Sequence, residues 1–247
     1  RITAIRTGPD SHHLIYTSHH ILMDGWSNSQ LLGEVLQHYA GQPAERKPGR
    51  YRDYIQWLQG QGKDRSEAFW REQLQDLQEP THLAQVFRQG KSNKDSGYAD
   101  HYQVLDWQPT LSEFARERRV TVNTLVQAAW LLLLQRYTGQ ECVAVGATVA
   151  GRPAEVAGAE HQLGLFINTL PVINRLQPTI TVEQWVTELQ GRNLALREHE
   201  HTALYDVQRL AGVAADGLFD TLLVFENYPV SEALREGAPA GLRFIDT

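Results

Sequence analysis

The sequence is short of cysteine, of long apolar runs and of basic residues. A single cysteine, Cys142, rules out a disulfide bond within the chain and fits a reducing cytoplasm. No stretch reaches the length of a transmembrane helix, and no signal peptide is recognisable, so we expect a cytoplasmic protein without a membrane partner. The 29 acidic residues outnumber the 23 basic ones, and this net charge of −6 disfavours nucleic acid as a partner.

The rest of the composition is that of an ordinary folded protein. Hydrophobic residues make up 42% and charged residues 21% of the 247 residues, which suffices for one large domain or two lobes. There are no internal repeats and no long low-complexity tract. The chain begins at Arg1, and residues 2–5 already have the pattern of a strand, so we expect it to be a part of something longer.

The stretch 18–27, Ser-His-His-Ile-Leu-Met-Asp-Gly-Trp-Ser, joins a predicted strand to a predicted helix. The apolar run at 14–16 is typical of a buried strand. A helix is expected over 28–40, because Ser27 with Gln30 is a capping pattern and apolar residues then recur at helical spacing. Two histidines, an aspartate and a glycine therefore lie on a connection of the kind where a rigid scaffold displays reactive groups.

Each of these residue types has a chemical use. The neutral imidazole of His19 or His20 can accept or donate a proton near neutral pH. Asp24 can hold a histidine ring or pair with a distant cation, and Gly25 can turn through backbone angles that other residues avoid. Taken alone, however, a His-His pair is commonly surface chemistry, and Asp-Gly is commonly just a turn. The rest of the chain has to decide between the two interpretations.

Hydrophobic patterning predicts both strands and helices along the rest of the chain. Strands are expected at 2–6, 13–17 and 142–149, at 219–229 ending in a turn, and more weakly at 98–106. Helices are expected at 51–58, around Trp70, from a capping box at Thr110 and Glu113, as a buried central helix at 124–137 ended by Gly139, from Thr181 with Gln184, and at 204–210. The histidines at 12–13 and 19–20 match no standard zinc spacing, and those at 199 and 201 are interpreted as an exposed helix end, so no metal site is expected.

The string His-His-x-x-x-Asp-Gly at 19–25, followed by Trp26 and Ser27, resembles the signature of the condensation domains of nonribosomal peptide synthetases. These domains belong to the superfamily of chloramphenicol acetyltransferase-like acyltransferases, which share the shorter His-x-x-x-Asp core. Four further stretches match in family order: Tyr-x-Asp-Tyr-x-x-Trp at 51–57, Gly-Arg-Pro at 151–153, Gly-x-Phe-x-Asn-Thr at 164–169 and Phe-Glu-Asn-Tyr-Pro at 225–229. The resemblance thus covers essentially the whole chain.

The resemblance implies an α/β (α+β) fold of the chloramphenicol acetyltransferase type, with two lobes arranged in a V. Residues 1–79 are then expected to form the end of the N-terminal lobe and residues 80–247 most of the C-terminal lobe, with the boundary at Glu79-Pro80. Two N-terminal family motifs, Ser-x-Ala-Gln and Arg-His-Glu, have no counterpart, and the last family elements are missing. We therefore expect a domain that is incomplete at both ends.

The resemblance also implies roles for the motif residues. His20 is expected to be the catalytic histidine, acting as a base or as a positioning group, while His19 shapes the loop and the amide of Gly25 faces the intermediate. Asp24 is expected to pair with an arginine, for which Arg152 is the candidate in this chain. Alternatively, Arg152 is solvated, or the partner of Asp24 lies in the N-terminal part that we expect to be missing.

Three further residues are carried over from the family as candidates for binding substrate. They are Trp26, Asn168 and Asn227, and each asparagine could instead cap the end of a strand.

The activity implied by the resemblance is amide-bond formation. A donor aminoacyl, peptidyl or acyl thioester on one carrier protein is transferred to the amine of an aminoacyl thioester on the next. No cofactor is expected to bind directly, because the phosphopantetheine arms belong to the upstream donor and downstream acceptor peptidyl carrier proteins. An adenylation domain of the same synthetase is the expected neighbour, and the chain is expected to act as a monomer within a multidomain protein.

Two alternatives stay open. An epimerisation domain shares the histidine motif but needs a second acid–base residue, for which no convincing glutamate motif is found. A non-catalytic, condensation-like recruitment module usually has a degraded motif, whereas His19, His20, Asp24 and Gly25 are all present here. A free acyltransferase using coenzyme A is less well supported, because the Asp-Phe-Gly-Trp-Gly stretch of such relatives is missing.

Overall fold

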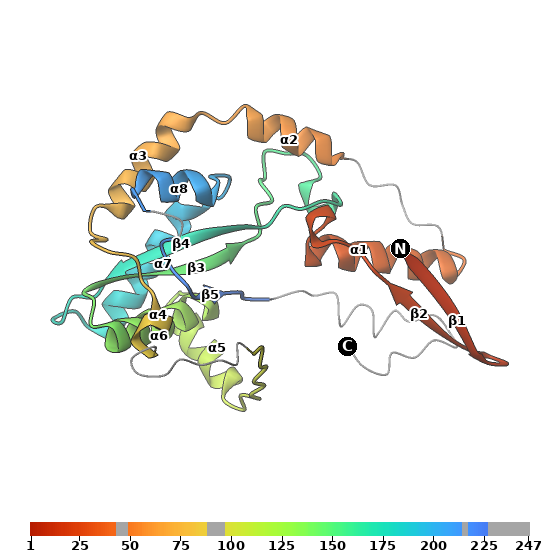
Figure 1. The fold of residues 1–247 in the computed structure, drawn as a ribbon, viewed down its shortest axis with the longest axis horizontal. Helices are drawn as coiled ribbons and strands as arrows, with labels where there is room; N and C mark the ends of the chain where they lie inside the picture. The colour runs from red at the N-terminus through yellow and green to blue at the C-terminus, as the bar shows by residue number, and fades with distance from the viewer. Residues whose placement is uncertain (43–48, 88–96, 214–216, 227–247) are drawn as a thin grey trace. The chain divides into compact units, whose positions relative to one another are not determined.

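A computed structural model describes residues 1–42, 49–87, 97–213 and 217–226, which form two compact units (Figure 1). Among these residues, unit 1 consists of Arg1–Gln61, Gly151–Ile167 and Glu226, and unit 2 of Gly62–Ala150 and Asn168–Phe225. This division differs from the expected lobes, 1–79 and 80–247. Residues 62–79 lie in unit 2 because Trp70 and Leu74 are buried in its core, and residues 151–167 lie in unit 1 because Phe166 is buried in the other core.

Unit 1 begins with the two strands expected at 2–6 and 13–17, but the second is not buried, because Leu14 and Ile15 are exposed. Strands β1 (Ile2–Gly8) and β2 (Ser11–Tyr16) pair antiparallel, with Ile2 opposite Tyr16. A short 3₁₀ helix (His20–Leu22) leads into α1 (Gly25–Tyr39), and α2 (Tyr51–Gln59) follows. The segment Gly151–Ile167, which also belongs to unit 1, contains a second 3₁₀ helix, Ala159–His161. The small hydrophobic core of unit 1 consists of Tyr54 from α2 and of Val156, Ala159 and Phe166 from this segment.

Helix α1 begins three residues before the position expected from the capping pattern. Its N-cap is Asp24, whose side chain accepts a hydrogen bond from the backbone N–H of Ser27. Ser27 lies inside the helix, and its hydroxyl binds Gly164 instead, while the Gln30 amide donates to the carbonyl of Glu160. The prediction of a Ser27 cap is therefore wrong, because partners distant in sequence take both side chains.

Unit 2 is built on a three-stranded sheet in the order β4-β3-β5. Strand β3 (Cys142–Val149) pairs antiparallel with β4 (Asn168–Arg175) and parallel with the short β5 (Leu222–Leu223) (Figure 1). The helices are α3 (Lys63–Leu74), α4 (Leu83–Phe87), α5 (Gln108–Glu117), α6 (Val122–Thr138), α7 (Val182–Arg197) and α8 (Leu204–Leu210). Their apolar faces enclose Trp70, Leu131, Leu134, Leu170 and Leu189.

Several predictions for unit 2 are confirmed. Strand β3 has the expected bounds, α7 begins with the complete capping box of Thr181 and Gln184, and Gly139 ends α6 in the left-handed conformation. The one cysteine, Cys142, is buried in this unit, and its burial raises the pKa of the thiol to about 11.

Other predictions for unit 2 are wrong. Residues 98–106 form no strand, since they are exposed and have no strand beside them within the described part of the chain. Helix α5 begins at Gln108, so Thr110 lies within its first turn rather than at its cap. Helix α6 is buried on one face only, and Leu132, Leu133 and Tyr137 are exposed. Of the strand expected at 219–229, only Leu222–Leu223 is a strand, and residues 227–229 lie outside the described residues.

Membrane spans and metal clusters are both lacking among the residues that the structure describes. None of their helices is both long and apolar enough to cross a bilayer. No group of three or more His, Cys, Asp or Glu side chains among them is arranged to hold a metal ion.

Candidate active site

The two motif histidines lie on the turn between β2 and α1. His19 caps the 3₁₀ helix, because its Nδ1 accepts the backbone N–H of Ile21 at 3.1 Å and its carbonyl accepts that of Leu22 at 3.0 Å. His20 is the first residue of that helix, and its ring is exposed. Within the described part of the chain, the imidazole of His20 makes no hydrogen bond or ion pair, so both of its nitrogens face solvent or an incoming group. The structure thus gives His19 a local bonding role and leaves His20 accessible.

Asp24 lies where this turn meets α1, and all of its bonding partners among the described residues belong to unit 1. Its carboxylate is fully buried and accepts from two backbone groups, Ser27 N–H at 2.8 Å and Phe166 N–H at 3.0 Å. Its own N–H donates to the carbonyl of Gly164 at 3.2 Å. A buried carboxylate with this many donors is held in one orientation. The chain that leaves His20 is therefore fixed four residues later.

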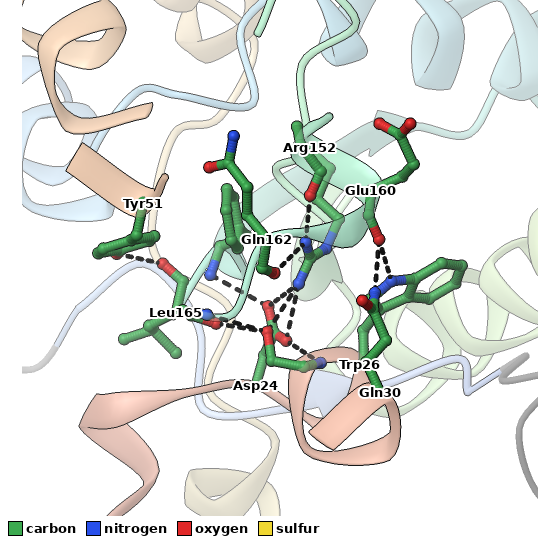
Figure 2. Close-up of polar contacts among 12 residues, drawn as sticks. Asp24, Trp26, Gln30, Tyr51, Arg152, Glu160, Gln162 and Leu165 are labelled. Carbon is green, nitrogen blue, oxygen red and sulfur yellow. Dashed lines mark hydrogen bonds and ion pairs between the residues drawn. The ribbon is translucent and has the colours of Figure 1, made fainter. Parts of the chain in front are cut away.

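Arg152 supplies the positive charge beside Asp24 (Figure 2). Its Nη2 lies 3.1 Å from Oδ1 and 3.4 Å from Oδ2, so the expected pairing is present as a contact. Its Nη1 donates to the carbonyls of Ala159 and Gln162, and the guanidinium lies 4.0 Å from the centre of the Phe166 ring. Only 9% of the Arg152 side chain is exposed, so it is not the solvated arginine of the alternative.

Two further residues at the start of α1 are Gly25 and Trp26. Gly25 does not have a positive φ, so the unusual turn expected of it is wrong, and it is the first residue of α1. The half-buried Trp26 donates its indole N–H to the carbonyl of Glu160 at 2.9 Å (Figure 2). The roles expected for the Gly25 amide and for Trp26 toward substrate stay predictions.

Tyr51 from α2 packs against the segment that contains Leu165 and Phe166. Tyr51 donates its hydroxyl to the carbonyl of Leu165 at 2.7 Å, and its ring meets that of Phe166 edge to face. Burial and the negative charge of Asp24 raise the pKa of Tyr51, against an opposing effect of the Leu165 hydrogen bond. Tyr51 therefore stays protonated and serves as a hydrogen-bond donor.

Asn168 lies in unit 2, at the start of β4. Its amide donates to the carbonyls of Glu200 at 2.9 Å and Thr202 at 2.7 Å, and its Oδ1 accepts from the Thr169 N–H. This geometry fits the alternative that Asn168 holds a strand end, and its contact with substrate stays a prediction. Asn227, the second asparagine expected to bind substrate, lies outside the described residues.

The turn that Asn168 supports carries two histidines that are not an exposed helix end. His199 is 6% exposed and stacks on Phe69, so that interpretation is wrong. The buried hydroxyl of Ser66 lies 3.3 Å from His199 Nδ1 and 3.2 Å from His201 Nε2. Burial lowers the pKa of both histidines, and the charges of His201 and Arg65 lower that of His199 further, against Glu198.

These lowered pKa values predict a loss of stability in acid. The unfolded chain binds protons at these histidines more readily than the folded one, so the free energy of unfolding should fall as pH drops below about 6.5. Urea midpoints measured at pH 7.5, 6.5 and 5.5 would show this decline. A variant carrying both His199→Gln and His201→Gln should show a shallower decline, and the exposed control His12→Gln the wild-type one. Equal declines in all three proteins would contradict the assignment.

Sequence patterns alone miss the residues that hold the motif in place. They assign Ser27 to a cap, and they give Tyr51 and Gly164 places in matched motifs without a role. Nothing local signals the contacts of these residues, because each partner lies far away in sequence. The available signal is the presence of Tyr51 and of Gly164 with Phe166 in other matched stretches.

With this geometry established, comparison with known proteins identifies the family. The family model described as "Condensation domain" matches residues 1–241. This chain belongs to the condensation-domain family. Its function at the level of the family is that of a condensation domain of the nonribosomal peptide synthetase type, in agreement with the prediction.

Curated relatives support the assignment over nearly the whole chain. A linear gramicidin synthase of Brevibacillus parabrevis is 39% identical over 260 residues, which cover 100% of this chain and 5% of that protein. Chondramide synthase cmdD of Chondromyces crocatus is 39% identical over 250 residues, covering 98% of this chain and 6% of that protein. The condensation domain thus spans a small fraction of the relatives it matches.

Solved structures show the same fold. A four-domain nonribosomal peptide synthetase bound to AMP and glycine matches 96% of this chain and 19% of its own, with a TM-score of 0.75 and 20% identity. The first condensation domain of the calcium-dependent antibiotic synthetase, in complex with a substrate analogue, matches 93% of this chain and 53% of its own, with a TM-score of 0.68 and 22% identity. The expected α/β fold class of chloramphenicol acetyltransferase type is thereby confirmed.

Proposed function

We propose that this condensation domain forms amide bonds by transferring an acyl, aminoacyl or peptidyl group between carrier proteins. The donor group is held as a thioester on the phosphopantetheine arm of an upstream carrier, and the amine that attacks it belongs to an aminoacyl thioester on a downstream carrier. We place the domain next to an adenylation domain of the same cytoplasmic synthetase. These arms are parts of the substrates, and the domain needs no cofactor of its own.

The observation that carries this proposal is the state of the histidine motif. His20 is exposed on a turn whose following residues are fixed by the buried Asp24–Arg152 pair. A recruitment module has no need for an accessible imidazole on a turn anchored by a buried ion pair. This supports an acid–base role for His20, because one accessible imidazole is presented by neighbours that are held in place.

The chemistry asked of His20 is modest, because a thioester is already activated. The acceptor nitrogen forms a bond to the donor carbonyl carbon, and the bond from that carbon to sulfur breaks. The nitrogen loses a proton, which His20 accepts or guides, and the departing thiolate ends as a thiol by gaining one. Most of the acceleration then comes from bringing the two bound arms together.

The test compares His20→Ala with wild type in the full-length parent protein, using both loaded carriers and mass spectrometry of the acceptor. We expect transfer to fall about 10²- to 10⁴-fold, the usual contribution of a positioned acid–base group. His12→Ala is the matched control, because His12 is an exposed histidine on β2. It should retain wild-type transfer.

Two outcomes would contradict the proposal. A folded wild-type parent that transfers nothing would favour recruitment, unless deuterium exchanges at the α-carbon of the bound aminoacyl group, which would indicate epimerisation. Transfer by His20→Ala at the wild-type rate would remove His20 from the mechanism.

A further inference from the structure

The hydroxyl of Ser27 is a fully used hydrogen-bonding group at the start of α1. Ser27 is 0% exposed. Its Oγ donates to the carbonyl of Gly164 at 2.8 Å, and accepts from the N–H of Gly164 at 3.1 Å and from Arg152 Nη2 at 2.8 Å. A serine hydroxyl has one hydrogen and two lone pairs, and all three are used here. No additional partner could be accommodated.

These bonds join two parts of unit 1 that are distant in sequence, the start of α1 and the segment around Gly164. Gly164 is held from α1 at its N–H by Ser27 and at its carbonyl by both Ser27 and the N–H of Asp24. Two residues later, the N–H of Phe166 binds the Asp24 carboxylate. The first turn of α1 and the segment 164–166 therefore form a clamp of backbone and side-chain bonds.

The side of segment 164–166 that faces away from α1 packs against Tyr51 of α2. A Cβ atom at Gly164 would overlap the ring of Tyr51, so the segment lies directly against α2. The Tyr51 hydroxyl binds the next carbonyl, that of Leu165. Segment 164–166 is thus held between Tyr51 and the turn that contains Asp24 and Ser27.

We propose that Ser27 is a positioning residue for the transfer reaction, acting with Gly164 to fix Asp24 and Arg152 and, through Asp24, the turn that presents His20. This inference rests on the proposed function. At its other end the turn continues from β2, and the Tyr16 hydroxyl contacts the sulfur of Met23 across it at 3.7 Å. Loss of the Ser27 hydroxyl removes its three bonds to Gly164 and Arg152, which loosens the support of Asp24, and small misplacements of a reacting group are costly to rate.

The test uses Ser27→Ala in the full-length parent, with Ser29→Ala as the matched control on the same helix. The Ser29 side chain makes no hydrogen bond within the described residues. At a temperature where thermal unfolding shows each variant fully folded, we expect kcat of Ser27→Ala to fall about 10- to 100-fold, with KM for both loaded carriers within about twofold of wild type. Ser29→Ala should match wild type in both constants.

A second readout is independent of transfer. In NMR spectra of ¹⁵N-histidine-labelled protein, the ring signals of His20, assigned with His20→Ala, should shift or broaden in Ser27→Ala and stay unchanged in Ser29→Ala. If the wild type transfers nothing, the proposed function fails, and these spectra still decide the role of Ser27. Unchanged His20 signals, or an unchanged kcat per folded molecule with lower thermal stability alone, would show that Ser27 is merely structural.

Discussion

Asp24→Asn is expected to lower the free energy of unfolding by about 3–5 kcal/mol, the usual cost of removing one partner from a buried ion pair. The substitution keeps the shape of the side chain but leaves the guanidinium of Arg152 without its counter-charge, at a site where only 9% of that side chain is exposed. It also places an NH₂ group where one carboxylate oxygen now accepts hydrogen bonds. The same decrease in the free energy of unfolding is expected for Arg152→Met, which leaves the buried carboxylate of Asp24 without its counter-charge.

The control for this prediction is an ion pair of similar length at the surface. Glu141 and Arg175 lie 2.7 Å apart, with side chains 78% and 51% exposed. Glu141→Gln should therefore cost about 1 kcal/mol or less. Urea unfolding of the condensation domain followed by tryptophan fluorescence would measure all three variants. If Arg152→Met unfolds like Glu141→Gln and transfers like wild type, the pair anchors nothing.

Gly151→Ala is expected to be similarly damaging, because Gly151 precedes Arg152 in a conformation that suits glycine alone. Its φ is +60°, and a Cβ atom there would overlap the carbonyl oxygen of Phe166. The left-handed backbone costs about 1–2 kcal/mol for alanine, and the forced overlap adds about 1–3 kcal/mol. The carbonyl cannot yield easily, since Phe166 is buried and its N–H is bound to Asp24.

Gly41→Ala separates these two contributions. Gly41 has a φ of +74°, and among the described residues no atom lies within 4 Å of an added Cβ. It should show the backbone cost alone, so the difference between the two variants in urea unfolding measures the overlap. Equal losses for Gly41→Ala and Gly151→Ala would mean that the contact with Phe166 relaxes freely.

Local sequence predicts the elements better than it predicts what holds them together. Strand β3 and the Thr181 cap follow from local patterns, and the structure has them as expected. The cap of α1 is displaced from Ser27 to Asp24, because the Ser27 hydroxyl has a distant partner in Gly164. A capping pattern cannot reveal such competition, since the competing groups are brought together only by folding.

Burial is similarly hard to predict from local sequence. Helix α6 reads as apolar nearly all round, yet Leu132 and Leu133 are exposed, because exposure depends on which neighbours pack against the helix. His199 and His201 read as polar surface, yet Ser66 and Phe69 from α3 lie against them. In the candidate active site, the Asp24–Arg152 pair could be predicted only because the family resemblance joined two motifs that are distant in sequence.

The pairing of β3 with β4 has a further consequence for how the site is assembled. Val149, the last residue of β3, lies opposite Asn168, the first residue of β4, so the sheet brings together the two ends of the segment between them. That segment carries Arg152 and Phe166, which contact Asp24. Closing a loop of this length lowers the conformational entropy of the chain, and the pairing of β3 with β4 compensates for that loss. The partners of Asp24 are thus delivered as a closed loop, so the contacts of the site depend on the pairing of two strands that contribute no side chain to them.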